Sequence, residues 1–124
     1  MSPPVEADDI AGHLPLKPRD FLILFALVEG PAHGYGILKE VSEDTGGGVQ
    51  LDPANLYRAL KRMMKHGLVS ESEKRPAPDL GDERRRYYTL SEFGSRLVAA
   101  EAERLRKLTD VAMARNLIPQ SKEG

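Results

Sequence analysis

The residues between Asp52 and Gly67 carry the clearest start and stop signals for a helix in this chain of 124 residues. Asp52 is a good N-cap, and Pro53 suits the first helical position because its missing N–H would have no partner there. Gly67 suits a left-handed cap at the other end. At about 100° per residue, the apolar side chains of this segment gather on one side. They are Leu56, Ala59, Leu60 and Met63. The segment therefore predicts a helix that is buried on one side only.

The opposite side of the same helix is cationic, and no acid occurs between Pro53 and Ser70. Such a face suits duplex DNA, with the first residues reaching base edges and the later ones meeting phosphates. The expected contacts are Asn55 with adenine, Arg58 with guanine or phosphate, and Lys61 and Arg62 with phosphate. Tyr57 lies at the edge of the buried stripe, where its hydroxyl either reaches a phosphate or its ring only packs. The alternative for the whole face is a solvated charged surface.

The formal net charge of −1 hides an uneven distribution. Residues 20–52 contain six acids and one base, whereas residues 53–75 contain six bases and two acids. Three more bases follow a short acidic stretch, and they are Arg84, Arg85 and Arg86. Because local charge decides contact with a polyanion, double-stranded DNA remains the expected partner.

Two helices before Asp52 and a hairpin after Gly67 complete the expected domain. The first helix starts near Pro18 with a buried stripe at the i, i+3, i+4, i+7 spacing, and the second starts near Gly34. The stripe consists of Phe21, Leu24, Phe25 and Val28. Residues 68–74 and 84–90 predict two strands around a proline-containing turn. A hairpin directly after a helix-turn-helix is a wing, and its arginines are expected at the minor groove or at flanking phosphates.

Ser91 is the expected N-cap of a final helix that runs to about Leu117, ahead of Pro119. A helix of about 26 residues would be about 39 Å long, which is more than the rest of a small domain can cover. An alanine-diluted heptad pattern runs along it. Its members are Val98, Ala102, Leu105, Leu108 and Ala112. We therefore expect this helix to pair with its own copy in a homodimer.

The predicted fold is mainly α with some β: a winged helix-turn-helix with a two-stranded wing and a long C-terminal dimerisation helix. Residues 1–16 hold three prolines and no helical period, so a mostly flexible arm is expected there, with Leu14 and Leu16 docking on the domain. Residues 17–90 are the expected DNA-binding domain, residues 91–118 the dimerisation helix, and residues 119–124 a disordered tail.

Composition and motifs argue against most other functions. The chain has no cysteine, which excludes disulfides, thiolate catalysis and cysteine-based zinc sites. No apolar run approaches the roughly 20 residues of a membrane span, and the N-terminus does not read as a signal peptide, so a cytoplasmic protein without a membrane partner is expected. The three histidines are separated, and the three glycines at 46–48 lack the Lys-Ser/Thr of a phosphate loop. We expect no catalytic residues, metal or cofactor, and no enzyme activity.

Four motifs taken together resemble those of the PadR family of bacterial transcriptional regulators. They are His33-Gly34-Tyr35-Gly36-Ile37, Leu56-Tyr57-Arg58-Ala59-Leu60-Lys61-Arg62-Met63, Gly67-Leu68-Val69, and the run from Arg85 to Gly94. Each motif is weak alone, but all four stand in family order and near family spacing. The resemblance covers residues 18–117 and is to the compact subfamily with a single C-terminal helix.

The resemblance implies a homodimer that binds a palindromic operator, as a repressor released by a small effector. The chain matches the family pattern at Tyr57, Arg85 and Arg86. It departs at Ala54 and Asn55, where the family often has glycine and a small hydroxyl residue, so the family's base preference is not carried over.

The family's effector sites imply a candidate pocket between the first helix and the dimerisation helix. Its lining would be Phe21, Phe25, Tyr35 and Phe93. With aromatic residues at only 6% of the chain, the favoured alternative is that these four side chains fill the core. Two other functions stay open: a protein-interaction module on a winged-helix scaffold, and a ligand-sensing protein whose DNA affinity is incidental.

Overall fold

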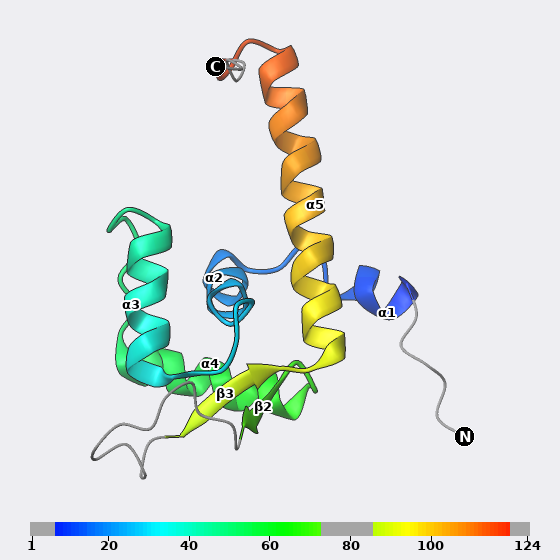
Figure 1. Cartoon of the computed structure of the whole chain (residues 1–124). Helices are drawn as coiled ribbons and strands as arrows, with labels where there is room; N and C mark the ends of the chain where they lie inside the picture. Colours follow the sequence, from blue (N-terminus) through cyan, green and yellow to red (C-terminus); the bar gives the residue numbers. More distant parts are fainter. Residues whose placement is uncertain (1–6, 73–85, 120–124) are drawn as a thin grey trace.

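The computed structural model describes residues 7–72 and 86–119. In chain order the elements are α1 (Ala7–Gly12), α2 (Pro18–Ala26), β1 (Ala32–His33), α3 (Gly34–Asp44), α4 (Pro53–Lys65), β2 (Val69–Ser72), β3 (Tyr87–Leu90) and α5 (Glu92–Ala114). Figure 1 shows α2 between α3 and α5, with α5 extending beyond the other helices. The predicted class is confirmed, since helices dominate, two strands of a small antiparallel sheet follow α4, and α5 is a long C-terminal helix.

The predicted helix boundaries follow from side chains that cap the backbone. The Asp52 carboxylate accepts a hydrogen bond from the Asn55 N–H at 3.2 Å, with Pro53 in the first turn of α4. Gly67 follows α4 with a φ of +77°, a left-handed conformation that glycine adopts without steric cost. At the start of α5, the Ser91 hydroxyl accepts from the Gly94 N–H at 2.9 Å. These local contacts explain why α4 and α5 begin where the sequence predicted.

The sheet has three strands, in the order β1-β3-β2, where the sequence predicted two. The added strand β1 pairs antiparallel with β3, with Ala32 opposite Tyr88 and His33 opposite Tyr87. His33 also caps α3, because its Nδ1 atom accepts a hydrogen bond from the Gly36 N–H at 3.1 Å. A strand of two residues is too short to leave an alternating pattern, which is why the sequence did not indicate it.

The N-terminal segment also differs from the expectation. Residues 7–12 form α1, so a flexible arm over the whole of residues 1–16 is wrong for this part. Ile10 of α1 belongs to the core, and Leu14 and Leu16 pack against it. A helix of six residues with one large apolar side chain shows no helical period in the sequence.

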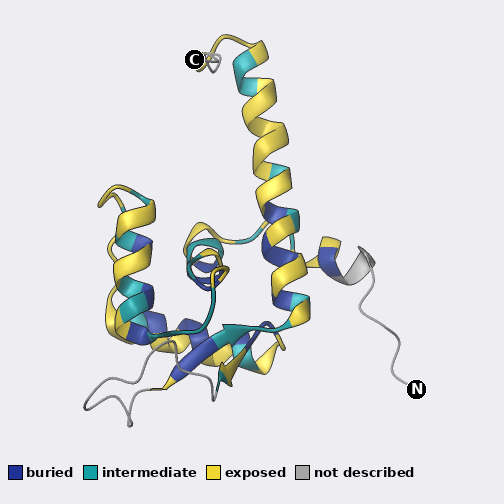
Figure 2. Ribbon diagram, viewed as in Figure 1, coloured by how far each residue is buried: buried dark blue, intermediate teal, exposed yellow. Residues whose placement is uncertain are grey.

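The core lies where α2, α3, α4 and α5 meet, and Figure 2 shows the buried residues gathered there. All four predicted apolar residues of α4 are buried. In α2 the predicted stripe is displaced: Ile23, Leu24 and Leu27 are buried, whereas Phe25 and Val28 are exposed. Because α2 packs against both α3 and α5, its buried side is set by two neighbours and not by the aromatic spacing alone.

Only the first part of α5 takes part in this core. Leu97 and Val98 are buried there, together with Glu101, whose carboxylate is paired with Arg104. From residue 102 onward most residues are exposed, as Figure 2 shows for the outer half of the helix. Within the described residues, no helix is long and apolar enough to cross a membrane.

Candidate nucleic-acid interface

The outward side of α4 carries the cations that the sequence predicted for DNA contact. Arg58, Lys61 and Lys65 are exposed, while Ala59, Leu60 and Met63, which stand between them in the sequence, are buried. The helix is fixed at its start by the Asp52 cap, and β2 begins four residues after its end. The fold therefore presents a rigid cationic helix face to solvent.

Asn55 and Arg58, the two predicted base contacts, are hydrogen-bonded to each other. An Nη2 N–H of Arg58 donates to the Asn55 side-chain oxygen. Both residues line a cleft between α4 and the start of α2. The amide and the guanidinium are thus oriented as one unit, one turn apart on the same helix.

Arg62, predicted as a phosphate contact, is engaged by an acid of another helix. Its two terminal nitrogens donate to the carboxylate of Asp20 on α2, over 3.0 and 2.9 Å. The Asp20 side chain is 12% exposed and that of Arg62 is 47% exposed. These hydrogen bonds raise the pKa of Arg62 against the opposing effect of its partial burial. The pair joins α4 to α2, a role the sequence did not indicate because the partners are 42 positions apart.

Tyr57 lies on the other flank of α4, against the first residue of α3. A Cβ placed on Gly34 would stand 2.4 Å from the Tyr57 hydroxyl oxygen, so this contact leaves no room for a side chain. The Tyr57 side chain is also half exposed. Burial, reinforced by the nearby Tyr57, raises the pKa of Tyr88 in β3. The ring of Tyr57 therefore packs at the junction of α3, α4 and the sheet while part of it stays in solvent.

The described part of the wing contains one of the three predicted arginines. Arg86 is exposed and pairs with Glu71 of β2 at 3.7 Å, across the β2–β3 ladder in which Glu71 is opposite Tyr88. Arg84 and Arg85 lie outside the described residues.

The predicted dimerisation residues divide into two groups along α5. Val98 is buried in the core of its own chain, so it is not available to a partner. Farther along, Leu105 and Leu108 are 37% and 53% exposed, and Val111, which the heptad did not include, is exposed as well. Ala102 is exposed and Ala112 is half-buried.

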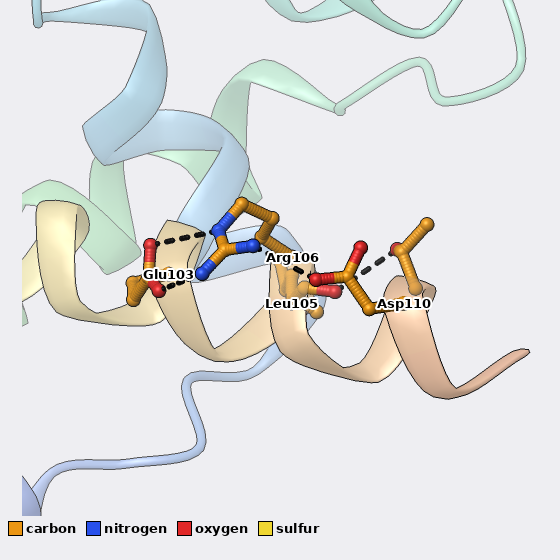
Figure 3. A network of polar contacts seen from close by, with 5 residues as sticks. Glu103, Leu105, Arg106 and Asp110 are labelled. Atoms are coloured by element: carbon orange, nitrogen blue, oxygen red, sulfur yellow. Dashed lines mark hydrogen bonds and ion pairs between the residues drawn. The ribbon is translucent and has the colours of Figure 1, made fainter. Parts of the chain in front are cut away.

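A polar network occupies another part of the α5 surface, as Figure 3 shows. The Arg106 guanidinium bonds to Glu103 one turn before it and to Asp110 one turn after it, the latter at 2.8 Å. The hydroxyl of Thr109 donates to the Leu105 carbonyl at 2.9 Å. The outer part of α5, which extends beyond the core, therefore carries both polar and apolar side chains.

The four aromatic residues of the candidate effector pocket do not converge on one cavity. Phe21 and Phe25 stack on each other at 5.5 Å, Phe93 meets His13 edge-on at 5.4 Å, and Tyr35 is exposed beside His33. An apolar cleft of about 240 Å³ lies between the end of α2, the end of β3 and α5. Of the four aromatics, Phe25 alone is among the residues that line it. In the described structure the four aromatic side chains thus lie in three separate places.

Comparison with known proteins identifies a family and several similar chains. The model of the transcriptional regulator PadR-like family matches residues 23–100. Protein X of Lysinibacillus sphaericus is 32% identical over 113 residues, covering 88% of this chain and 95% of that protein. A 37.1 kDa protein of transposon TN4556 from Streptomyces fradiae is 35% identical over 88 residues; these are 71% of this chain but only 23% of that protein.

Solved structures show the same fold. A PadR family transcription regulator from Clostridium difficile superposes with a TM-score of 0.65 at 29% identity, covering 80% of this chain and 97% of that one. A transcriptional regulator from Clostridium thermocellum gives a TM-score of 0.60 at 25% identity, covering 94% and 99% of the two chains.

Proposed function

Because the chain belongs to the transcriptional regulator PadR-like family, we propose that it represses transcription by binding a palindromic operator as a homodimer. The observation that carries the proposal is α4, a helix capped at its start, buried on one side and cationic on the other. We assign DNA contact to Asn55, Arg58 and Lys61 on its outward side, with Tyr57 at one flank and Arg86 in the wing.

The size and chemistry of α4 suit the major groove of duplex DNA. A helix with its side chains is about 10–12 Å wide, and the groove is about 12 Å wide. The joined Asn55 and Arg58 side chains sit near the N-terminus of α4, which is the end that reaches base edges in helix-turn-helix proteins. Lys61 and Lys65 follow on the outward side, where phosphates of the groove wall would meet them.

The proposed dimer rests on α5. Leu105, Leu108 and Val111 place apolar surface in solvent on a helix that extends beyond its own domain. Pairing of two such helices about a two-fold axis would bury this surface and set two copies of α4 at a fixed spacing. A two-fold protein binds a site with two inverted half-sites, which is the reason for a palindromic operator.

Release by a small effector is part of the same proposal. The apolar cleft lined by Phe25, Val28 and Leu90 lies where α2, β3 and α5 meet. A small apolar molecule bound there would act on the junction between the DNA-binding domain and the dimerisation helix.

The test is binding of the purified protein to duplex DNA from the region upstream of its own gene, measured at several salt concentrations. Each phosphate contact should contribute about −0.9 to the slope of log K against log salt. Arg58→Ala should weaken specific binding without lowering the melting temperature, because Arg58 is exposed. Lys39→Ala, which removes an exposed cation of α3, is the matched control. A flat salt dependence, or no preference for the upstream DNA, would contradict the proposal.

One observation favours a second candidate function, a module that docks a basic protein partner. The outer side of α3 is acidic: a hydrogen bond that the protonated Glu40 donates to Asp44, together with the charges of Asp44, Glu43 and Glu29, raises the pKa of Glu40. A partner held there would still bind after Arg58→Ala, whereas Glu40→Gln with Glu43→Gln would abolish its binding.

A further inference from the structure

The cleft between α2 and α4 is lined by cations from both helices and not from α4 alone. It measures about 760 Å³, and its walls include Lys17 and Arg19 from the start of α2 as well as Asn55, Arg58 and Arg62 from α4. Lys17 and Arg19 stand outside the motifs and the cationic face that predict DNA contact. Their position beside three predicted DNA contacts, Asn55, Arg58 and Arg62, needs an explanation.

The net charge of the cleft is positive, because its acid, Asp20, is paired with Arg62. Asp20 is the acid of the cleft, and Arg62 neutralises it through two hydrogen bonds. Lys17 and Arg19 are exposed, and within the described residues neither forms an ion pair. Lys17, Arg19 and Arg58 therefore remain as positive charges around one concave surface.

The place of the cleft on α4 indicates what it would meet. Since a helix nearly fills the major groove, its two flanks face the two phosphate backbones that border the groove. Tyr57 is on the flank next to α3, and Asn55 and Arg62 are on the flank next to α2. A backbone strand passing the α2 flank would thus run along the cleft.

We propose that Lys17 and Arg19 form a phosphate-binding site for the DNA backbone, which extends the interface from α4 onto the start of α2. This inference rests on the proposed function above. The Asp20–Arg62 pair gives it rigidity, because it fixes α2 to α4 next to both cations. The site takes phosphate without reading bases, so it strengthens binding to every sequence alike.

The experiment compares the wild type with the double variant Lys17→Ala/Arg19→Ala on the upstream duplex and on an unrelated duplex. The slope of log K against log salt is negative, and loss of two phosphate contacts should make it shallower by about 1.8. Binding should weaken about 30-fold near 0.15 M salt. The loss should be equal for the two duplexes, with an unchanged melting temperature. Lys39→Ala/Lys107→Ala, which removes exposed cations from α3 and α5, is the matched control and should change the slope little.

The outcomes separate this inference from the function on which it rests. If the wild type binds DNA and Arg58→Ala weakens it, but Lys17→Ala/Arg19→Ala keeps the wild-type slope, the phosphate site is overturned and the regulator remains. If the wild type binds no DNA, both are overturned. Titration with inorganic phosphate is the last arm: a site that binds free phosphate, and whose loss leaves the DNA slope unchanged, would belong to a small anion and not to DNA.

Discussion

The hydroxyl oxygen of Tyr57 on α4 lies so close over Gly34, the first residue of α3, that a Cβ on Gly34 would stand 2.4 Å from it. The ring carbon that bears the hydroxyl would be 2.9 Å away. These two helices are the two halves of the helix-turn-helix, so this contact sets how near the start of α3 comes to the DNA-reading helix. The constraint at Gly34 is the space that the Tyr57 ring occupies and not an unusual backbone angle.

Gly34→Ala is expected to destabilise the protein by about 1–3 kcal/mol, as overpacking of a close contact generally does. The cause is the Tyr57 ring, so the same substitution in a Tyr57→Ala background should cost much less. Chemical denaturation of the four proteins in this cycle measures the coupling between the two positions. Equal costs of Gly34→Ala in both backgrounds would show that the ring is not the obstacle.

The Asp20–Arg62 pair predicts a difference between two arginines of the same helix. Arg62→Ala leaves the nearly buried Asp20 carboxylate without its two hydrogen bonds, and should reduce stability by about 1–2 kcal/mol. This loss of stability is small because the Arg62 side chain is half exposed and solvent screens its charge. Arg58→Ala should leave the stability unchanged.

A double-mutant cycle with Asp20→Asn tests the same pair. Once the carboxylate is gone, Arg62→Ala should cost much less than in the wild type. Additive free energies of unfolding would mean that the two side chains act independently and that the pair does not hold α2 to α4.

The sequence predicts features that depend on contacts between residues close in the chain, and it does not predict those that depend on contacts between distant segments. The cap of α4 at Asp52 and the left-handed glycine that follows the helix at Gly67 depend on contacts within a few residues, and both were predicted correctly. The ion pair of Arg62 with Asp20 depends on how two helices meet in space, and no local pattern encodes it. For that reason the cationic face was predicted, while the structural role of one of its members was not.

The aromatic residues also depend on contacts between distant segments. The resemblance to the family implies a pocket lined by Phe21, Phe25, Tyr35 and Phe93 between the first helix and the dimerisation helix. In the structure Phe93 turns toward His13, which belongs to a segment that the sequence left without structure. Without the N-terminal segment in place, the surroundings of Phe93 could not be derived.

Glu101 predicts a pH dependence of stability. Its side chain is 2% exposed and accepts two hydrogen bonds of 2.7 Å from Arg104. These bonds, and one from the Leu16 backbone N–H, lower the pKa of Glu101 against the opposing effect of burial. A carboxylate with a depressed pKa contributes stability above its unfolded-state value, and the contribution is lost as pH falls through the folded-state value.

Glu101→Gln should therefore cost about 1–2 kcal/mol near neutral pH. The difference between variant and wild type should shrink as the pH falls below the ordinary glutamate value of 4.5. Glu103→Gln is the control, because Glu103 forms a similar pair with Arg106 on the exposed part of the same helix. Thermal unfolding across the acidic range measures both. A cost of Glu101→Gln that stays constant with pH would contradict the role of the charge.

The apolar surface of α5 predicts the effect of Leu108 on assembly. Leu108 is 53% exposed in the single chain, and a two-fold dimer would bury it twice. Burial of a leucine is worth about 1.5–3 kcal/mol, so Leu108→Gln should weaken the dimer by about 100-fold or more. Lys107→Gln places the same side chain at the neighbouring exposed position and should leave the dimer intact.

Sedimentation equilibrium of the three proteins across the micromolar range measures this effect on its own, and DNA binding then connects it to function. A palindromic operator is bound tightly only when both half-sites are engaged, so Leu108→Gln should also weaken operator binding and reduce its dependence on half-site spacing. Binding to a single half-site should change little, because Leu108 lies on α5 and far along the chain from α4. A monomeric wild type, or a Leu108→Gln variant that sediments as the wild type does, would contradict the role of α5 in dimerisation. A palindromic operator would then have no explanation in the structure of the protein.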